Sequence, residues 1–301
     1  MPTPLRATLL AFAAIALPAG AQQDFSRVEI QATKLTESVY MLVGSGGNIG
    51  VSIGADTVFL VDDQYAPLTP KIMAAVGALT PKPVKFVLNT HWHGDHTGGN
   101  ENLGKAGVII LAQDNVRKRM ATDQVIAFFD MKTKAEPGVA LPVITFSAET
   151  TFHFNGDEIH AFHAPRAHTD GDTIVHFRKS DVIHMGDTYF NGLYPFIDAS
   201  SGGTVDGVIA AADKALAIAG DATKIIPGHG PLSNKAELKA YRDMLATVTA
   251  RIRKMVKEGR KVEEIATSGV TAEFDAAWGK GFLAPPMFAR MMAMNIIQSG
   301  P

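Results

Sequence analysis

The sequence predicts an α/β fold in which two sheets pack face to face and helices cover their outer sides. Short apolar runs separated by glycine, proline and polar residues predict strands. Longer segments between these runs predict helices, and the order of strands, helix, strands and helix occurs twice along the chain. The chain from about residue 233 is predicted to be helical. Two sheets with helices outside them would bury the apolar face of each element. We therefore expect one domain over residues 22–301.

In the first half of the chain, apolar runs predict strands at residues 39–43, 49–53, 58–61, 84–88 and 108–111. Helices are expected over 69–79, over a short segment that closes at 102–105, and over about 115–129. Residues 131–149 contain Pro137, Gly138 and Pro142 and show little periodicity. They predict a long surface connection, which at this length is often functional.

In the second half, strands are expected at residues 151–154, 158–163, 173–177, 181–184 and 224–226, with a helix over about 205–219. Apolar residues then recur at steps of three and four, which places them on one buried face of a helix: Leu238, Tyr241, Leu245, Val248, Ile252 and Met255. Asn234 followed by Glu237 predicts a capping box at the start of this helix.

The first residues have the features of a signal peptide. Arg6 is followed by an apolar run over residues 9–17, by Pro18, and by the small residues 19–21. The run is too short to span a bilayer, which takes about 20 apolar residues. We therefore expect residues 1–21 to be a signal peptide, and the mature protein to be periplasmic or secreted without a membrane anchor.

Composition excludes several functions. The chain has 301 residues and no cysteine, which excludes disulfides, thiolate metal ligands and thiol catalysis. Its formal net charge is -2 and its pI about 6.5, so no basic surface is expected for nucleic acid. The sequence contains no indication of an oligomeric state.

A polar cluster follows the expected strand at 84–88. Within residues 90–99, His91, His93, Asp95 and His96 are interleaved with glycines. Imidazole and carboxylate are good zinc ligands, and a tight loop allows several of them to converge on one point. This cluster predicts a metal site.

Further ligand candidates lie in other polar loops next to expected strands. His168 lies between two strands, Asp187 follows the strand at 181–184, and His229 follows the strand at 224–226. Asp62 ends another strand, where it could accept a hydrogen bond from a ligand imidazole or be an ordinary strand-end residue. Four aromatic residues in nearby loops are candidates for substrate walls: Tyr65, Phe190, Tyr194 and Phe196.

The His-x-His-x-Asp-His motif, the later His168, Asp187 after a glycine, and the Pro-Gly-His-Gly turn resemble the metallo-beta-lactamase superfamily. The resemblance covers roughly residues 37–232. It implies a four-layer αβ/βα sandwich with two metal ions at one edge, followed here by a helical C-terminal extension. The ligand set it implies is His91, His93 and His168 for one metal, Asp95, His96 and His229 for the other, and Asp187 as a bridge. We expect two zinc ions per chain, and iron or manganese also suits these ligands.

The sequence departs from several class B beta-lactamases, which have a cysteine at the position of Asp187. An aspartate there resembles glyoxalase II and related hydrolases. Beta-lactamases of the cysteine-containing subclasses also tend to place a lysine three residues later, where this chain has Phe190. That difference predicts weaker recognition of a substrate carboxylate.

We expect a zinc-dependent hydrolase in which a metal-bridging hydroxide attacks the amide, lactone or ester carbonyl of a small acyl substrate. Asp95 is the expected catalytic residue, because it could accept the proton of the hydroxide as well as bind metal. Beta-lactam hydrolysis is among the expected activities. The alternatives are a thioesterase similar to glyoxalase II, which the export signal disfavours, and an iron-dependent oxidoreductase of the same fold.

Overall fold

The computed structural model describes residues 24–300, and the expected signal peptide lies outside them. Seven strands of this part of the chain form the first sheet, in the order β1-β2-β3-β4-β5-β6-β9. The pairs from β1 to β4 are antiparallel, and the pairs from β4 to β9 are parallel. The strands are β1 (Gln31–Lys34), β2 (Val39–Val43), β3 (Ile49–Ile53), β4 (Val58–Val61), β5 (Val84–Asn89), β6 (Ile109–Gln113) and β9 (Ile144–Phe146).

The second sheet has six strands among the described residues, in the order β10-β11-β12-β13-β14-β15. Its pairs are antiparallel except for β13 and β14, which are parallel. The strands are β10 (Glu149–Phe154), β11 (Asp157–His163), β12 (Thr173–Phe177), β13 (Val182–His184), β14 (Lys224–Ile226) and β15 (Ser233–Asn234).

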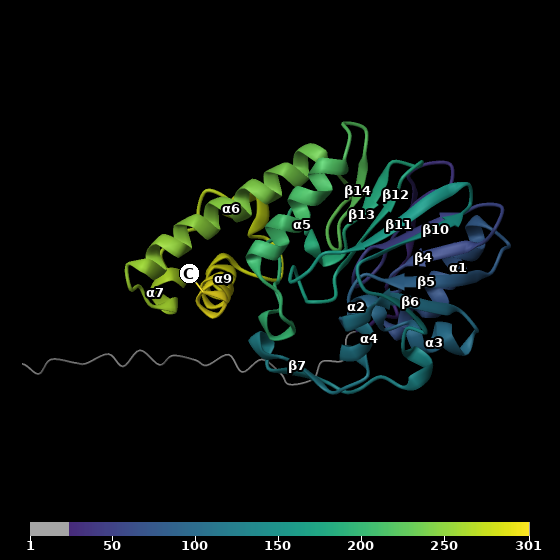
Figure 1. Cartoon of the computed structure of the whole chain (residues 1–301), viewed down its shortest axis with the longest axis horizontal. Helices are drawn as coiled ribbons and strands as arrows, with labels where there is room; N and C mark the ends of the chain where they lie inside the picture. The colour runs from purple at the N-terminus through teal and green to yellow at the C-terminus, as the bar shows by residue number, and fades with distance from the viewer. Residues whose placement is uncertain (1–23, 301) are drawn as a thin grey trace, which may run out of the picture.

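The helices lie outside the two sheets. Figure 1 shows α5 and α6 on the side of β13 and β14 that faces away from β4 and β5. The α-helices are α1 (Thr69–Leu79), α2 (Gly94–Thr97), α3 (Asn100–Lys105), α4 (Asp114–Met120), α5 (Val205–Ile218), α6 (Lys235–Lys257), α7 (Val262–Ala266), α8 (Asp275–Trp278) and α9 (Pro285–Ser299). Within residues 24–300, no helix is both long and apolar enough to cross a bilayer.

Side-chain alternation along the strands produces three buried layers. On β4, Phe59 and Val61 pack between the sheets, whereas Val58 and Leu60 pack on the outer side against α1. The outer side of the second sheet packs against α5, α6 and α9, and Ile183 of β13 belongs to that cluster. The expected αβ/βα sandwich is confirmed, and the C-terminal residues add helices to one side of it.

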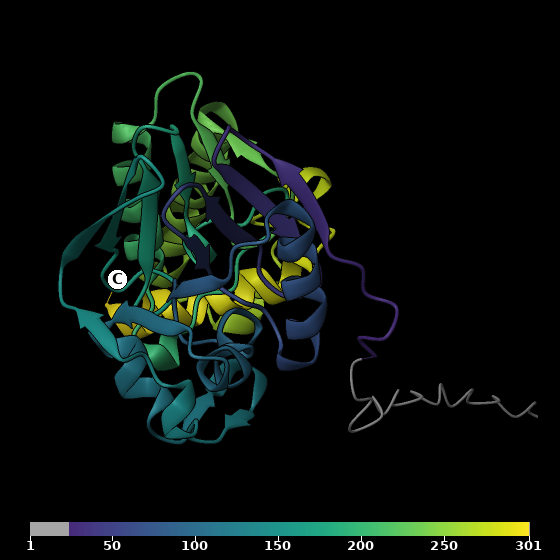
Figure 2. The same cartoon turned by 90° about the vertical axis from the view of Figure 1, so that its right-hand side faces the viewer.

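Two predictions in the segment after β6 are wrong. The helix expected over about 115–129 ends at Met120, and residues 124–126 instead form β7 (Gln124–Ile126). The surface connection expected over 131–149 contains β8 (Met131–Thr133), which pairs with β7, and β9, which extends the first sheet beside β6. Figure 2 shows this teal segment gathered at one end of the sandwich.

The structure contains one of the two hydrogen bonds of the capping box expected at the start of α6. Asn234 accepts a hydrogen bond from the backbone N–H of Glu237 (3.1 Å). The Glu237 carboxylate accepts a hydrogen bond from the hydroxyl of Ser233 (2.8 Å), the residue before Asn234, instead of from the Asn234 N–H.

Candidate metal centre

The seven predicted site residues lie together where the two sheets meet. His91 and His93 follow β5, and Asp95 and His96 lie on α2. The other three residues come from the second sheet: His168 from the loop between β11 and β12, Asp187 from the turn after β13, and His229 from the loop after β14. A hydrogen bond from the Thr173 N–H to the Thr90 carbonyl (2.8 Å) joins the two sheets at this edge.

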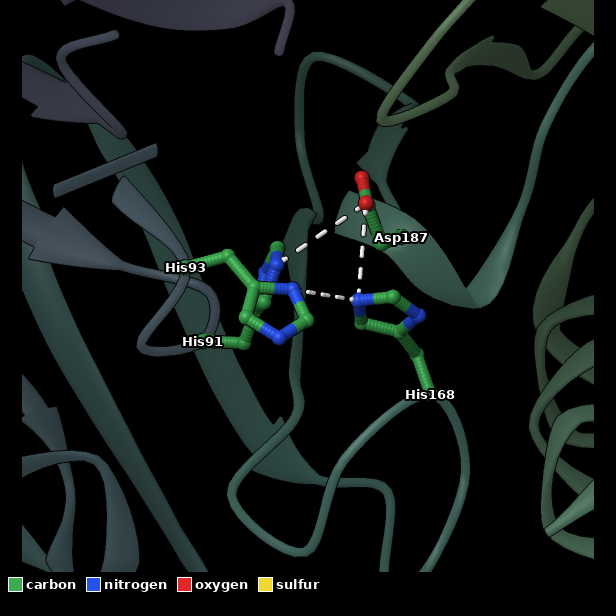
Figure 3. Close-up of side chains that lie close together, drawn as sticks. All are labelled: His91, His93, His168 and Asp187. Atoms are coloured by element: carbon green, nitrogen blue, oxygen red, sulfur yellow. Dashed lines mark hydrogen bonds and ion pairs between the residues drawn. The ribbon is translucent and has the colours of Figure 1, made fainter. Parts of the chain in front are cut away.

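Among the described residues, the candidate ligand atoms fall into two groups. One group is His91, His93, His168 and Asp187, and the other is Asp95, His96 and His229. Within each group the ligand atoms lie within 4.8 Å of one another. Figure 3 shows the side chains of the first group pointing toward one another.

The carboxylate of Asp187 lies between the two groups. Its Oδ2 is 3.8 Å from His91 Nε2 and 3.6 Å from His168 Nε2. Its Oδ1 is 3.0 Å from His96 Nε2 and 3.4 Å from His229 Nε2. Each carboxylate oxygen therefore faces one group, as the expected bridging role requires.

The outer nitrogens of three imidazoles are hydrogen-bonded to groups that can only accept. His96 Nδ1 lies 2.8 Å from the Asp62 carboxylate, His93 Nε2 lies 3.1 Å from Asp198, and His168 Nδ1 lies 2.8 Å from the Phe196 carbonyl. In neutral rings these nitrogens carry the protons, so the other nitrogen of each ring presents a lone pair to the cluster.

These lone pairs show that the residues fit metal ions. His93 Nδ1 and His168 Nε2 face each other at 2.8 Å, which is unfavourable without a cation or a proton between them. His91 Nε2 is buried and has no hydrogen-bond partner among the described residues. A buried, unsatisfied nitrogen is costly, and a metal ion would satisfy it.

Two glycines lack the side chains that would overlap this cluster. A Cβ at position 47 would lie 2.1 Å from the His96 ring, and a Cβ at 228 would lie 2.0 Å from Asp187 Oδ1. Gly47 and Gly228 therefore allow the chain to approach the ligands closely.

Burial and the two carboxylates shift the pKa values of the imidazoles in opposite directions. Burial lowers the pKa of His168 to about 4, so this ring is neutral at neutral pH. Burial also lowers the pKa of His229, but Asp187 and Asp95 outweigh it and raise that pKa to about 9. The two carboxylates thus attract positive charge to this position, either a proton or a metal ion.

Of the two interpretations of Asp62 from the sequence, the structure agrees with the first, because its carboxylate accepts a hydrogen bond from a candidate ligand imidazole, that of His96. Asp62 is buried, with φ of 66°, and it accepts hydrogen bonds from the Thr90 N–H (2.7 Å) and hydroxyl (2.8 Å) in addition to its contact with His96. These bonds fix the ring of His96 and the first residue of the motif loop.

Asp198 is a further supporting residue that the sequence did not indicate. Its carboxylate contacts His93 and accepts hydrogen bonds from the Ser200 hydroxyl, the Ser201 hydroxyl (2.5 Å) and the Ser201 N–H (3.2 Å). Burial alone would raise the pKa of Asp198, but His93 and the hydroxyls of Ser200 and Ser201 together outweigh it and hold this pKa well below its usual value. An aspartate followed by serines predicts a turn, and nothing in that pattern points to His93.

A cavity of about 460 Å³ opens over the cluster. Three of the four expected wall residues line it, namely Tyr65, Phe190 and Phe196. Tyr194 was wrongly predicted as a wall residue: its ring stacks on Phe288 in the interior, with centroids 4.2 Å apart. Lining residues that the sequence did not indicate include Ile126, Phe129, Met131, Leu193 and Phe282.

An αβ/βα sandwich with a His/Asp metal-binding cluster at the edge between its sheets defines a class of metal-dependent proteins. The model of the Metallo-beta-lactamase superfamily matches residues 44–229, and the chain therefore belongs to that superfamily. It is accordingly a metal-binding hydrolase of this family.

Three similar proteins illustrate the relationship. A beta-lactamase-like protein 2 homolog of Caenorhabditis elegans is 26% identical over 282 residues, covering 88% of this chain and 83% of that protein. A hydroxyacylglutathione hydrolase of Nitrosococcus oceani is 30% identical over 153 residues, which is 49% of each protein. The solved structure of the sec-alkylsulfatase Pisa1 from Pseudomonas sp. has a TM-score of 0.65 at 18% identity, covering 89% of this chain and 50% of that one. The last of these likenesses concerns the fold alone.

Proposed function

We propose that this protein is an exported hydrolase with two zinc ions, acting on the amide, lactone or ester carbonyl of a small acyl substrate. The observation that carries the proposal is the Asp187 carboxylate, which turns one oxygen toward each ligand group. A single metal ion would leave one of these oxygens buried beside unpaired imidazoles.

The proposed ligands follow the two groups. His91, His93 and His168 would hold one ion, Asp95, His96 and His229 would hold the other, and Asp187 would contact both. Two bound ions would supply a hydroxide nucleophile near neutral pH and positive charge for the substrate carbonyl.

The protein's own residues would position the reaction and handle the proton. Asp62 and Asp198 hold the rings of His96 and His93 in fixed orientations. Asp95 lines the cavity and lies 3.2 Å from His229 through Oδ2. Its second oxygen, Oδ1, would accept the proton released when water is activated.

A thioesterase is the second candidate. The similarity to a hydroxyacylglutathione hydrolase over about half of each chain supports it. The same ligand groups would serve a thioester carbonyl, with a thiolate as the leaving group.

The first test is the metal content of the purified protein, combined with hydrolysis of a chromogenic cephalosporin, a neutral aryl ester and a thioester. We expect about two zinc ions per chain and hydrolysis that a chelator abolishes and zinc restores. His168→Ala should lose metal and activity. His153→Ala is the matched control, because His153 is exposed on β10 and belongs to neither group.

Two results would contradict the proposal. One is chelator-resistant turnover in a protein free of metal. The other is bound iron with oxygen consumption in place of hydrolysis, which would favour the oxidoreductase alternative. Export is tested separately: we expect periplasmic or secreted material to begin near residue 22, and an intact N-terminus in the cytosol would refute it.

A further inference from the structure

The cavity wall beyond the ligand groups is apolar and mainly aromatic. Neighbouring rings connect Phe196 to Phe129 (centroids 4.8 Å apart), Phe129 to Phe282 (6.4 Å) and Phe282 to Phe190 (6.4 Å). We call these four neighbouring rings, of Phe196, Phe129, Phe282 and Phe190, the aromatic arch. They come from the loop between β13 and α5, from the β7–β8 hairpin and from the C-terminal helical part.

Two rings of this arch remain largely open to solvent. Phe129 is 41% exposed and Phe282 is 58% exposed, and both line the cavity. The neighbouring Met131 on β8 is 47% exposed. Apolar side chains gathered in this way at the mouth of a cavity indicate a surface that an apolar ligand covers.

No lysine or arginine lines the cavity in the part of the chain that the structure describes. On β8, Met131 and Thr133 line it, and Lys132 between them projects to the other face of the strand. Arg119, nearby in the chain, is engaged with both carboxylate oxygens of Asp170 at 2.7 and 2.8 Å.

The polar groups that remain outside the ligand cluster are uncharged. Tyr65 and Thr133 line the cavity and carry hydroxyls, whereas the indole N–H of Trp92 already donates to Ser201 (3.1 Å). Hydroxyls can bind the carbonyl or ether oxygen of a neutral substrate. They would leave a carboxylate without a charged partner, which is unfavourable in a largely apolar cavity.

We propose that the cavity selects uncharged esters or lactones with an alkyl or aryl group, and discriminates against acyl groups that carry a carboxylate. Phe129 and Phe282 are the specificity-determining residues. This inference rests on the hydrolase function proposed above and narrows its substrates. Each methylene buried against the arch should raise kcat/KM about fourfold, which corresponds to roughly 0.8 kcal/mol.

The test compares two esters that differ in one group. The zinc-loaded protein is assayed with 4-nitrophenyl hexanoate and with the mono-4-nitrophenyl ester of adipic acid, in which a carboxylate replaces the terminal methyl. We expect kcat/KM to favour the neutral ester by about tenfold or more. Equal rates, or a preference for the anionic ester, would overturn the proposal.

Variants at Phe282 locate the selectivity. Since this side chain is 58% exposed, neither Phe282→Arg nor Phe282→Leu should disturb folding. Phe282→Arg should reduce the preference for the neutral ester at least severalfold, because it adds a cation at the rim, whereas Phe282→Leu should retain it. Similar changes in both variants would contradict a selectivity based on charge.

A binding measurement separates this inference from the proposed hydrolase function. The ketones 2-octanone and 7-oxooctanoate form a similar neutral and anionic pair that cannot be hydrolysed, and calorimetry measures their Kd values. Tighter binding of 2-octanone supports the inference even if no ester is hydrolysed, an outcome that would refute only the hydrolase proposal. Equal affinity for the two ketones in a protein that hydrolyses esters would refute only the inference.

Discussion

Replacing Asp198 tests whether a residue outside the ligand groups controls the metal centre. The Asp198 carboxylate receives only donors: His93 Nε2 and the Ser201 hydroxyl at Oδ2, and the Ser200 hydroxyl and Ser201 N–H at Oδ1. In Asp198→Asn, an amide NH₂ must face one of these two pairs of donors. If the NH₂ group takes the position of Oδ2, it faces the donors His93 and the Ser201 hydroxyl, and the hydrogen bond to His93 is lost. If it takes the position of Oδ1, it faces the donors Ser200 and the Ser201 N–H.

The expected cost follows from that loss. A hydrogen bond to a charged group is worth about 1.5–3 kcal/mol, which corresponds to roughly a 10- to 150-fold change in a binding constant. We expect zinc affinity at the group containing His93 to fall by about 10- to 100-fold, the range typical of partners that orient ligand imidazoles. The affinity of the group containing His229 should change much less.

The assay is a competition titration of zinc against a chromophoric chelator, with thermal unfolding as a check on folding. Asp213→Asn is the matched control, because Asp213 is a partly exposed partner of Arg242 (2.8 Å) and lies outside both ligand groups. If a folded Asp198→Asn protein bound both zinc ions as tightly as the wild type, the supporting role of Asp198 would be disproved.

Three further outcomes are expected. Gly228→Ala should lose metal, because its Cβ would lie 2.0 Å from Asp187 Oδ1, while Gly220→Ala, whose nearest contact is 3.7 Å, should keep it; elemental analysis of both proteins decides this. Zinc binding at the group of His96 and His229 should release protons at pH 7 and strengthen as the pH rises toward 9. The pKa of His229 is raised to about 9, and Asp187, Asp95 and Asp62 outweigh burial and raise the pKa of His96 as well, whereas burial lowers the pKa values of His91 and His168, which have no proton to release. Calorimetry in buffers of different ionisation enthalpy measures the protons, and equal release from both groups would contradict this. Chelation should lower the thermal unfolding temperature as well as activity, since the ions satisfy buried ligands, and an unchanged melting temperature would show that they do not.

Most of the sandwich could be predicted because its strands are apolar runs bounded by turn residues. β1 could not, since Gln31–Lys34 is exposed at every position and has no hydrophobic alternation. β7, β8 and β9 have only three residues each. Such strands are defined by their hydrogen-bonded partners, and periodicity in a single segment cannot reveal pairing between segments.

The positions of the candidate ligands could be predicted for a different reason. His91, His93, Asp95 and His96 are concentrated in one short loop, and polar clusters at the end of an apolar strand are distinctive. Asp198 lies 105 residues from His93 in the sequence, so only the fold brings them together. The sequence pattern around Phe129 predicted a helix over about 115–129, and a residue at the end of such a helix was not expected to line the cavity.

The position of Phe282 in the chain bears on how substrate preference can differ among related proteins. It belongs to the C-terminal residues, beyond the segment 44–229 that the superfamily shares, yet it forms part of the substrate cavity. One of the two proposed specificity-determining residues, Phe282, is thus encoded outside the stretch that contains all the candidate ligands, whereas the other, Phe129, lies within it. Proteins that keep every candidate ligand can therefore acquire new substrates by changes in this appended segment alone, and a comparison restricted to the shared core would group them as equivalent.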